Sequence, residues 1–229
     1  MREIGPIERP KTLMELAYGE IKNLLTTGQL EFDTIYSANY FADILKVSRT
    51  PVREALLQLT AEGFLVSVQG RGFKIREFFE KEVRDFFETR KMIEAYVIEH
   101  LVGILTEEDF QPLEECCRQM KENSLSGTTP LFLEADKGFH MSLVHRYKNL
   151  FLKSIMEDIR NLISIFGQKA LSRAGRTQEV IDEHEQILQA LRRKDKNEAV
   201  DAMIYHLNTT EKSLLENLKP NDKMNQREP

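Results

Sequence analysis

One short pair of β-type runs constrains the fold of this chain more than any other feature. The pair covers residues 65–76, and its centre contains Gly70 and Gly72, a pattern typical of a β-hairpin. The preceding residues, 11–63, repeat apolar side chains at helical spacing in three segments, with a tight turn at Lys46 between the second and the third. Three helices followed by a hairpin predict a winged helix-turn-helix.

After residue 78 the pattern is helical almost throughout, and it predicts an all-α bundle of about six helices. We therefore expect a mainly α protein, in which an N-terminal winged helix-turn-helix (three helices plus a hairpin wing) is joined to a C-terminal helical bundle. The expected domains are a flexible arm at 1–10, the winged helix-turn-helix at 11–78, the bundle at 79–218 and a disordered tail at 219–229. Breaks between the bundle helices are expected near residues 103–106, 124–130, 147–149, 174–177 and 194–197.

Charge is unevenly distributed along the 229 residues. The net charge is −5, yet residues 46–76 contain six basic and two acidic side chains. A basic segment on an acidic protein fits a DNA-facing end joined to a separate ligand domain. We find no apolar run long enough to cross a bilayer and no secretion signal, so we expect a cytoplasmic protein without a membrane partner. The adjacent cysteines, Cys116 and Cys117, fit that reducing compartment, and the sequence assigns them no role.

The third predicted helix has the residues of a recognition helix at its N-terminal end. Arg49, Thr50 and Arg53 lie in its first turns, where a recognition helix meets base edges in the major groove. Arg49 and Arg53 are four apart and share a face, and arginine can pair with O6 and N7 of guanine. In the hairpin, Arg71 can enter the minor groove, and Gly72 lets the backbone approach the sugar-phosphate edge. We predict that these five residues bind double-stranded DNA.

Asp136 and three histidines fall on inward faces of the predicted bundle helices. Asp136 and His140 are four apart and share a helical face. His184 and His206 each lie beside apolar residues that recur at helical spacing. One carboxylate and three imidazoles that converge in a bundle can hold a divalent metal, whereas a single histidine on an apolar face is more often an ordinary core residue. We expect one metal per chain, with zinc as the first candidate and nickel, iron or manganese as alternatives.

The DNA-reading block resembles the GntR family of regulators. The resemblance rests on VSRTPVREAL at residues 47–56, on Glu-Gly at 62–63 and on Gly-Arg-Gly-Phe at 70–73. It implies DNA contacts by the arginines and the threonine of the predicted recognition helix and by the glycine of the hairpin. The family usually has Pro-Gly where this chain has Phe32-Asp33, and often has arginine where it has Asn39, so a DNA contact made there by other members is missing or changed.

The bundle resembles the FCD-type sensor domain of the FadR branch of that family. The resemblance implies that the aspartate and the three histidines bind a metal, that the effector is a small organic acid and that the regulator is a homodimer. It makes Arg90 a candidate for contacting the effector carboxylate, and Asn149 is a second effector-binding candidate. Glu183 and Asn149 are candidates for orienting the imidazoles. The matching residues are Arg90, Glu94, Asp136, Phe139, His140, Asn149, Glu183, His184, Ile187, Leu188 and His206.

Together these features predict a ligand-responsive transcription regulator. We expect it to be a repressor whose repression is relieved by a small carboxylate effector. Two copies on a two-fold axis would bind an inverted-repeat operator. Two alternatives stay open, a metal-dependent enzyme and a regulator that senses the metal itself. The chain contains no Gly-rich phosphate loop, Gly-x-Ser-x-Gly elbow or His-Glu-x-x-His motif, so we expect no enzyme activity.

Overall fold

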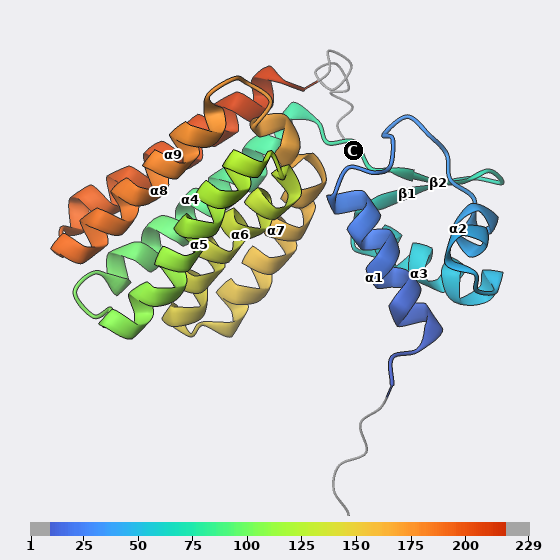
Figure 1. Ribbon diagram of the computed structural model, residues 1–229, viewed down its shortest axis with the longest axis horizontal. Coiled ribbons are helices and arrows are strands. Elements are labelled where there is room, and N and C mark those ends of the chain that lie inside the picture. The colour runs from blue at the N-terminus through green and yellow to red at the C-terminus, as the bar shows by residue number, and fades with distance from the viewer. Residues whose placement is uncertain (1–9, 219–229) are drawn as a thin grey trace, which may run out of the picture. The chain divides into compact units, whose positions relative to one another are not determined.

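The computed structural model describes residues 10–218, so the arm expected at 1–10, apart from Pro10, and the tail expected at 219–229 lie outside the described residues. The chain divides into two compact units, with the boundary between Arg76 and Glu77. The first unit has three helices and a two-stranded hairpin, and the second is built from helices alone (Figure 1). The prediction of a mainly α protein with a winged helix-turn-helix and a helical bundle is confirmed.

The first unit contains α1 (Leu13–Thr26), α2 (Ala38–Leu45), α3 (Arg49–Ala61), β1 (Leu65–Val68) and β2 (Gly72–Ile75). α1 and α2 both pack against α3, and α3 also contacts β1. The apolar faces of the helices and the hairpin therefore share one core. Its buried members include Ile21, Phe41, Val52, Leu56, Leu59, Phe64 and Ile75.

Local hydrogen bonds set where the first two helices begin. At α1 the Thr12 hydroxyl accepts from the Glu15 N–H at 3.2 Å, and the Glu15 carboxylate accepts from the Thr12 N–H at 2.7 Å, which forms a capping box. At α2 the Ser37 hydroxyl accepts from the Tyr40 N–H at 3.1 Å. Lys46 ends α2 in the left-handed conformation, with φ 55°, and so produces the tight turn that leads into α3.

The hairpin is held in place by a second segment of the same unit. β1 and β2 are antiparallel, with Leu65 opposite Ile75. Tyr36 and Phe73 exchange backbone hydrogen bonds of 2.7 and 2.9 Å beside it. Gly72 adjoins this bridge at φ 139°, and a Cβ there would lie 2.4 Å from the Tyr36 carbonyl oxygen. Position 72 therefore requires a glycine because the hairpin lies close to the segment around Tyr36 in the same chain.

The second unit is a bundle of six helices within the part of the chain that the structure describes. α4 packs against α9 and α6, α5 against α6 and α8, and α7 against α6 and α9 (Figure 1). Among the helices of residues 10–218, none is long and apolar enough to cross a membrane. The six helices are α4 (Glu80–Leu101), α5 (Glu107–Ser126), α6 (Thr129–Tyr147), α7 (Leu150–Ala170), α8 (Arg176–Arg193) and α9 (Lys196–Glu216).

The loops between these helices lie at the expected positions in the sequence, except that the loop between α7 and α8 begins earlier. α7 ends at Ala170 and α8 begins at Arg176, so this loop starts before the expected residues 174–177. Gly175, at φ 80°, adjoins α8, and a left-handed residue cannot continue a helix. Pro130 lies inside the first turn of α6 rather than in the loop, because the missing N–H of a proline has no helical partner there.

Replacing Gly72 by alanine should destabilise the hairpin more than replacing Gly70. Both glycines have positive φ, 139° and 68°, so alanine costs on the order of 1–2 kcal/mol at either position. Only at Gly72 would the new methyl group meet backbone atoms, whereas nothing lies within 4 Å at Gly70. We expect Gly72→Ala to lower the amide hydrogen-exchange protection of β1 and β2 by more than ~2 kcal/mol. An equal loss for Gly70→Ala would contradict the Tyr36 contact as the cause.

Candidate functional site

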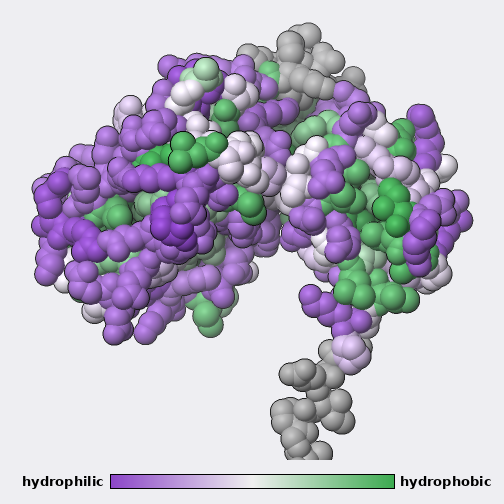
Figure 2. All heavy atoms as spheres, in the orientation of Figure 1, coloured by the Kyte–Doolittle hydropathy of each residue, from purple (hydrophilic) through white to green (hydrophobic). Residues whose placement is uncertain are grey.

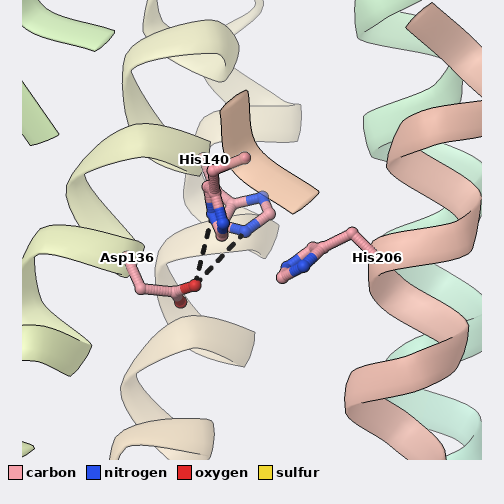
Figure 3. Close-up of side chains that lie close together, drawn as sticks. Asp136, His140 and His206 are labelled. Carbon is pink, nitrogen blue, oxygen red and sulfur yellow. Dashed lines mark ion pairs between the residues drawn. The ribbon is translucent and has the colours of Figure 1, made fainter. Parts of the chain in front are cut away.

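Asp136, His140, His184 and His206 converge inside the bundle. Asp136 and His140 lie one turn apart on α6, His184 lies on α8 and His206 on α9. Each residue offers one ligand atom, and these atoms all lie within 4.8 Å of one another. Figure 3 shows Asp136, His140 and His206 pointing toward one another. The three histidines are fully buried, while Asp136 is partly exposed. The residues that were candidates on spacing alone are therefore brought together in space.

The Nε2 atoms of the imidazoles are the nitrogens that can bind a metal at the centre of this cluster. Asp136 Oδ1 lies 3.4 Å from His184 Nε2 and 3.8 Å from His140 Nε2. The Nε2 atoms of His140 and His184 are buried and have no hydrogen-bond partner in the structure. A buried polar atom without a partner is costly, so a site that contains two such atoms side by side needs an explanation.

The other ring nitrogen, Nδ1, is paired in all three histidines. Each partner is a carboxylate or carbonyl oxygen, and such an oxygen can only accept a hydrogen bond. Nδ1 therefore carries the proton in each ring, and Nε2 keeps its lone pair for a ligand. The pairs join His140 to Glu94 Oε2, His184 to the Val180 carbonyl oxygen at 2.7 Å, and His206 to Glu183 Oε2 at 2.7 Å.

Two buried arginines hold the glutamates that orient the imidazoles. Arg90 Nε donates to Glu94 Oε1 at 2.7 Å. Arg176 binds Glu183 through two parallel hydrogen bonds of 2.5 and 3.0 Å, and the Thr209 hydroxyl donates to the same carboxylate at 3.0 Å. Hydrogen bonds between a guanidinium and a carboxylate are strong and directional, so they restrain the geometry of both side chains. The imidazole on α6 and the imidazole on α9 are thus each positioned by an arginine–glutamate pair.

The protonation states inside the cluster suit metal binding. Burial lowers the pKa of His184 to about 4, and burial together with Arg90 and Arg160 holds the pKa of His140 well below its usual range. Burial by itself raises the pKa of Asp136, but the Arg160 guanidinium and the three imidazoles together outweigh it and keep that pKa well below its usual range. At neutral pH His140 and His184 are therefore neutral and Asp136 is ionised, which are the forms that bind metals.

A divalent cation fits this set of donors. Three nitrogen ligands and one oxygen ligand suit zinc, and also nickel, iron or manganese. The unpartnered Nε2 atoms of His140 and His184 would gain a partner from such an ion. A core of histidines with satisfied hydrogen bonds, the ordinary alternative, would not leave these atoms unpaired.

A small cavity adjoins the cluster, and two guanidiniums line it. Its volume is about 30 Å³, and Asp136, Arg90 and Arg160 are among its lining residues. Arg90 and Arg160 are both buried, and Arg90 Nη2 and Arg160 Nε have no hydrogen-bond partner. The Nη2 atom of Arg160 pairs with Asp136 Oδ2. The cavity therefore contains unused donors next to the candidate metal site.

Arg160 is a site residue that sequence reasoning missed. It lies on α7 between Met156 and Ile163, which are both buried. Residues three or four apart share a helical face, so Arg160 is a cation within an apolar stripe. That break in the pattern was the available signal for a buried functional charge.

Asn149 lies outside this cavity, and its prediction as an effector-binding residue stays a prediction. It is exposed and does not line the cavity. Its side-chain oxygen accepts from the N–H groups of Phe151 and Leu152 at 3.0 and 3.2 Å. The side chain therefore caps α7, which is a common role for asparagine before a helix.

The basic residues singled out in the first unit lie on its surface. Arg49, Thr50 and Arg53 are exposed at the N-terminal end of α3, whose opposite face is buried in the core. Arg71 is exposed in the turn of the hairpin, and Gly72 is partly exposed at the start of β2. Within residues 10–218 none of these three guanidiniums has an ion-pair or hydrogen-bond partner. Their guanidiniums are therefore available to an external anion.

Two family models match this chain. Residues 13–75 match the family described as bacterial regulatory proteins of the gntR family. Residues 85–209 match the FCD domain, which by itself covers more than half of the chain. The two matches fall within the first and the second structural unit, respectively.

Named regulators are similar over most of the chain. The gluconate operon transcriptional repressor of Bacillus subtilis is 27% identical over 197 residues, which cover 83% of this chain and 79% of the repressor. The Exu regulon transcriptional regulator of Escherichia coli K12 is 26% identical over 223 residues, which cover 89% and 85%. The solved structure of E. coli McbR/YncC has a TM-score of 0.76 at 22% identity and covers 90% of this chain and 99% of that one, which shows the same fold.

Replacing His184 by alanine should remove most of the metal from protein supplied with zinc. Loss of a residue that only hydrogen-bonds to a metal ligand typically weakens metal binding by roughly 10–100-fold. Loss of one of the four ligands themselves should weaken zinc binding by more than that. The matched control is His145→Ala, because His145 is half-exposed and lies outside the cluster. Elemental analysis after dialysis, with circular dichroism to check folding, measures the effect. Wild-type zinc content in folded His184→Ala protein would exclude this metal site.

Proposed function

This chain belongs to the gntR family of bacterial regulatory proteins and carries an FCD domain, and we propose that it is a repressor that releases DNA when a small carboxylic acid binds its helical unit. Members of these families are transcription regulators, so the chain is a regulator and not an enzyme. Because the target is bacterial DNA, we place the protein in the cytoplasm. The observation that carries the DNA-binding part is the set of exposed guanidiniums at α3 and in the hairpin, which have no partner among residues 10–218.

DNA would be bound by the two arginine-bearing elements of the first unit. Arg49 and Arg53 are four apart on α3, so one face of the helix can present both to base edges in the major groove. Thr50 lies beside them and suits a phosphate or a thymine methyl group. Arg71 suits the minor groove. Gly72 is needed because its backbone approaches Tyr36 closely, so it would shape the hairpin that presents Arg71. A glycine has no side chain, so any DNA contact that it makes would be through its backbone.

The second unit would hold one divalent metal through Asp136, His140, His184 and His206. Zinc is the first candidate, and nickel, iron and manganese accept the same donors. When bound, the ion supplies positive charge and coordination positions that an effector carboxylate can occupy. Glu94, Glu183 and the Val180 carbonyl oxygen keep the imidazoles oriented for it.

The charges around the cluster favour an anionic effector. Three guanidiniums and three carboxylates surround the imidazoles, so they balance one another before a metal binds. A divalent cation would leave this poorly solvated region positively charged, and a carboxylate would offset part of that charge. Arg90 and Arg160 provide the unpaired donors that can bind it. The ion pairs are Arg90 with Glu94, Arg160 with Asp136 and Arg176 with Glu183.

The chain itself links the effector site to the DNA-binding unit. The first unit ends at Arg76 and α4 begins at Glu80, so only residues 77–79 intervene. The same helix carries Arg90 and Glu94, which face the cavity and the cluster. An effector that moves Arg90 would therefore act on the helix attached to the DNA-binding unit. To act as a switch, it must bind the DNA-free state more tightly than the DNA-bound state.

A homodimer would double the DNA contacts and make the operator an inverted repeat. Figure 2 shows mostly hydrophilic side chains on the visible face of the bundle, with smaller hydrophobic areas between them. Exposed apolar side chains include Met92 and Tyr96 on α4 and Phe151 on α7, with exposed fractions of 69%, 46% and 82%. The Tyr96 ring contacts that of Tyr147, close in sequence to Phe151. This apolar surface supports a contact with a second copy.

A regulator that senses the metal itself is the remaining alternative. It predicts that DNA binding follows the free metal concentration and needs no acid. The unpaired donors of Arg90 and Arg160 favour an organic effector, because they serve no purpose in binding a cation. Full DNA release by zinc alone would support the alternative and contradict the proposed effector.

Replacing Arg49 or Arg53 by alanine should weaken binding to a duplex that the wild-type protein selects from a random pool. Each change should cost about 1–3 kcal/mol, because a guanidinium that pairs with guanine is lost. The control is Arg118→Ala, which removes an exposed arginine from α5 in the other unit. Fluorescence anisotropy of labelled DNA gives the affinities, and all variants should keep the wild-type zinc content. Unchanged affinity in both α3 variants would refute the assignment of α3 to the groove.

A further inference from the structure

The lining of the cavity beside the cluster defines the kind of acid that it suits. Resting on the proposed function, we propose that the effector is a monocarboxylate with a compact, unhydroxylated hydrocarbon group, such as a short branched-chain acid. The carboxylate would face the two guanidiniums and the candidate metal, and the hydrocarbon group would face the remaining wall.

The charged part of the cavity wall suits a carboxylate. Arg90 and Arg160 line the cavity with 1% and 4% of their surfaces exposed, and each has a buried guanidinium nitrogen without a partner. Asp136 and His206, two of the candidate metal ligands, line the same cavity. Planar guanidiniums pair well with carboxylate oxygens. An anionic group is therefore matched by this part of the wall.

The rest of the wall is apolar except for Thr210, and it comes from five helices and the loop that follows α7. Such a surface is stabilised by contact with a hydrocarbon group rather than with water or hydroxyls. The apolar side chains that carry this point are Phe87, Phe132, Leu133, Ile163, Leu171 and Leu214.

Hydroxyl groups on the effector would find almost no partners in this wall. Thr210 is the only uncharged side chain with a hydroxyl or amide group among the lining residues of the described chain. Its oxygen already accepts from Arg176 Nη2 at 3.0 Å. Each further hydroxyl would lose its hydrogen bonds to water on binding, which weakens affinity by about tenfold or more per group. A polyhydroxy acid is therefore disfavoured.

The apolar lining argues against gluconate as the effector, although the name of one relative would suggest it. That relative is named as the repressor of a gluconate operon, and it is 27% identical to this chain. Gluconate carries a hydroxyl on every carbon beyond the carboxylate. The lining residues of this chain do not provide the partners that such a molecule needs.

The size of the cavity favours a compact molecule. Its 30 Å³ is far below the roughly 150 Å³ of a cavity that binds benzene, so an acid must enlarge it by moving side chains. Leu133 and Leu171 are partly exposed and can turn toward solvent. Gly167 lines the cavity within α7, and a Cβ there would meet Leu133 at 3.4 Å, an ordinary contact. Gly167→Ala should therefore keep the fold and occupy space that the effector needs.

Calorimetric titration of the full-length, zinc-loaded protein tests the proposal. The probes are isovalerate, the hydroxy acids lactate and gluconate, and acetate as the smallest carboxylate. We expect isovalerate to bind at least tenfold more tightly than either hydroxy acid. Gly167→Ala should weaken isovalerate at least tenfold and change acetate less. The control is Gly19→Ala, a helical glycine of the first unit with nothing within 4 Å of its Cβ position, which should change neither.

The outcomes separate this proposal from the proposed function. If gluconate or lactate binds more tightly than isovalerate and releases DNA, the regulator stands and only the proposed effector chemistry is overturned. If Gly167→Ala weakens acetate as strongly as isovalerate, the apolar wall does not hold the hydrocarbon group, and the proposal is likewise overturned. If no carboxylate of any kind binds or releases DNA, the effector part of the proposed function fails together with this proposal.

Discussion

The hydrogen bonds that hold the Nδ1 atoms of three buried imidazoles are the interactions on which the rest of the second unit depends. Glu94, Val180 and Glu183 provide only acceptor oxygens at these positions, so each ring must present its Nε2 lone pair inward. Without them the rings could turn, and the four ligand atoms would not stay within 4.8 Å of one another. The proposed metal, the anionic effector and the switch all require that fixed orientation.

The same hydrogen bonds connect the cluster to its surroundings. Arg90 supports Glu94 through Nε and leaves Nη2 free at the cavity, so one guanidinium serves both the metal-binding ring and the proposed effector. Both residues lie on α4, and only three residues separate this helix from the first unit. Local chemistry in the bundle can therefore reach the DNA-binding unit through one rigid helix. No long chain of intermediate contacts is needed.

Local sequence patterns predicted the fold and much of the site, because their causes are local. Helical spacing placed Asp136 and His140 on one face, and Ser37 marked the start of a helix. What the sequence could not predict depends on partners far along the chain. Arg176 bonds Thr210 thirty-four residues later, and nothing near Arg160 in sequence identifies Asp136 as its partner. Asn149 shows the reverse case, since its capping role is local and the family resemblance did not indicate it.

The proposed metal site requires that all three buried histidines present the lone pair of Nε2 to the centre of the cluster, and their tautomers can be measured. Long-range ¹⁵N–¹H correlation spectra of the imidazoles report which ring nitrogen carries the proton, and variants at each histidine assign the signals. We expect His140, His184 and His206 to carry the proton on Nδ1 and none on Nε2, with or without zinc. A proton on Nε2 of any of these three rings in the purified protein would contradict it, because that ring could not present a lone pair to the centre of the cluster.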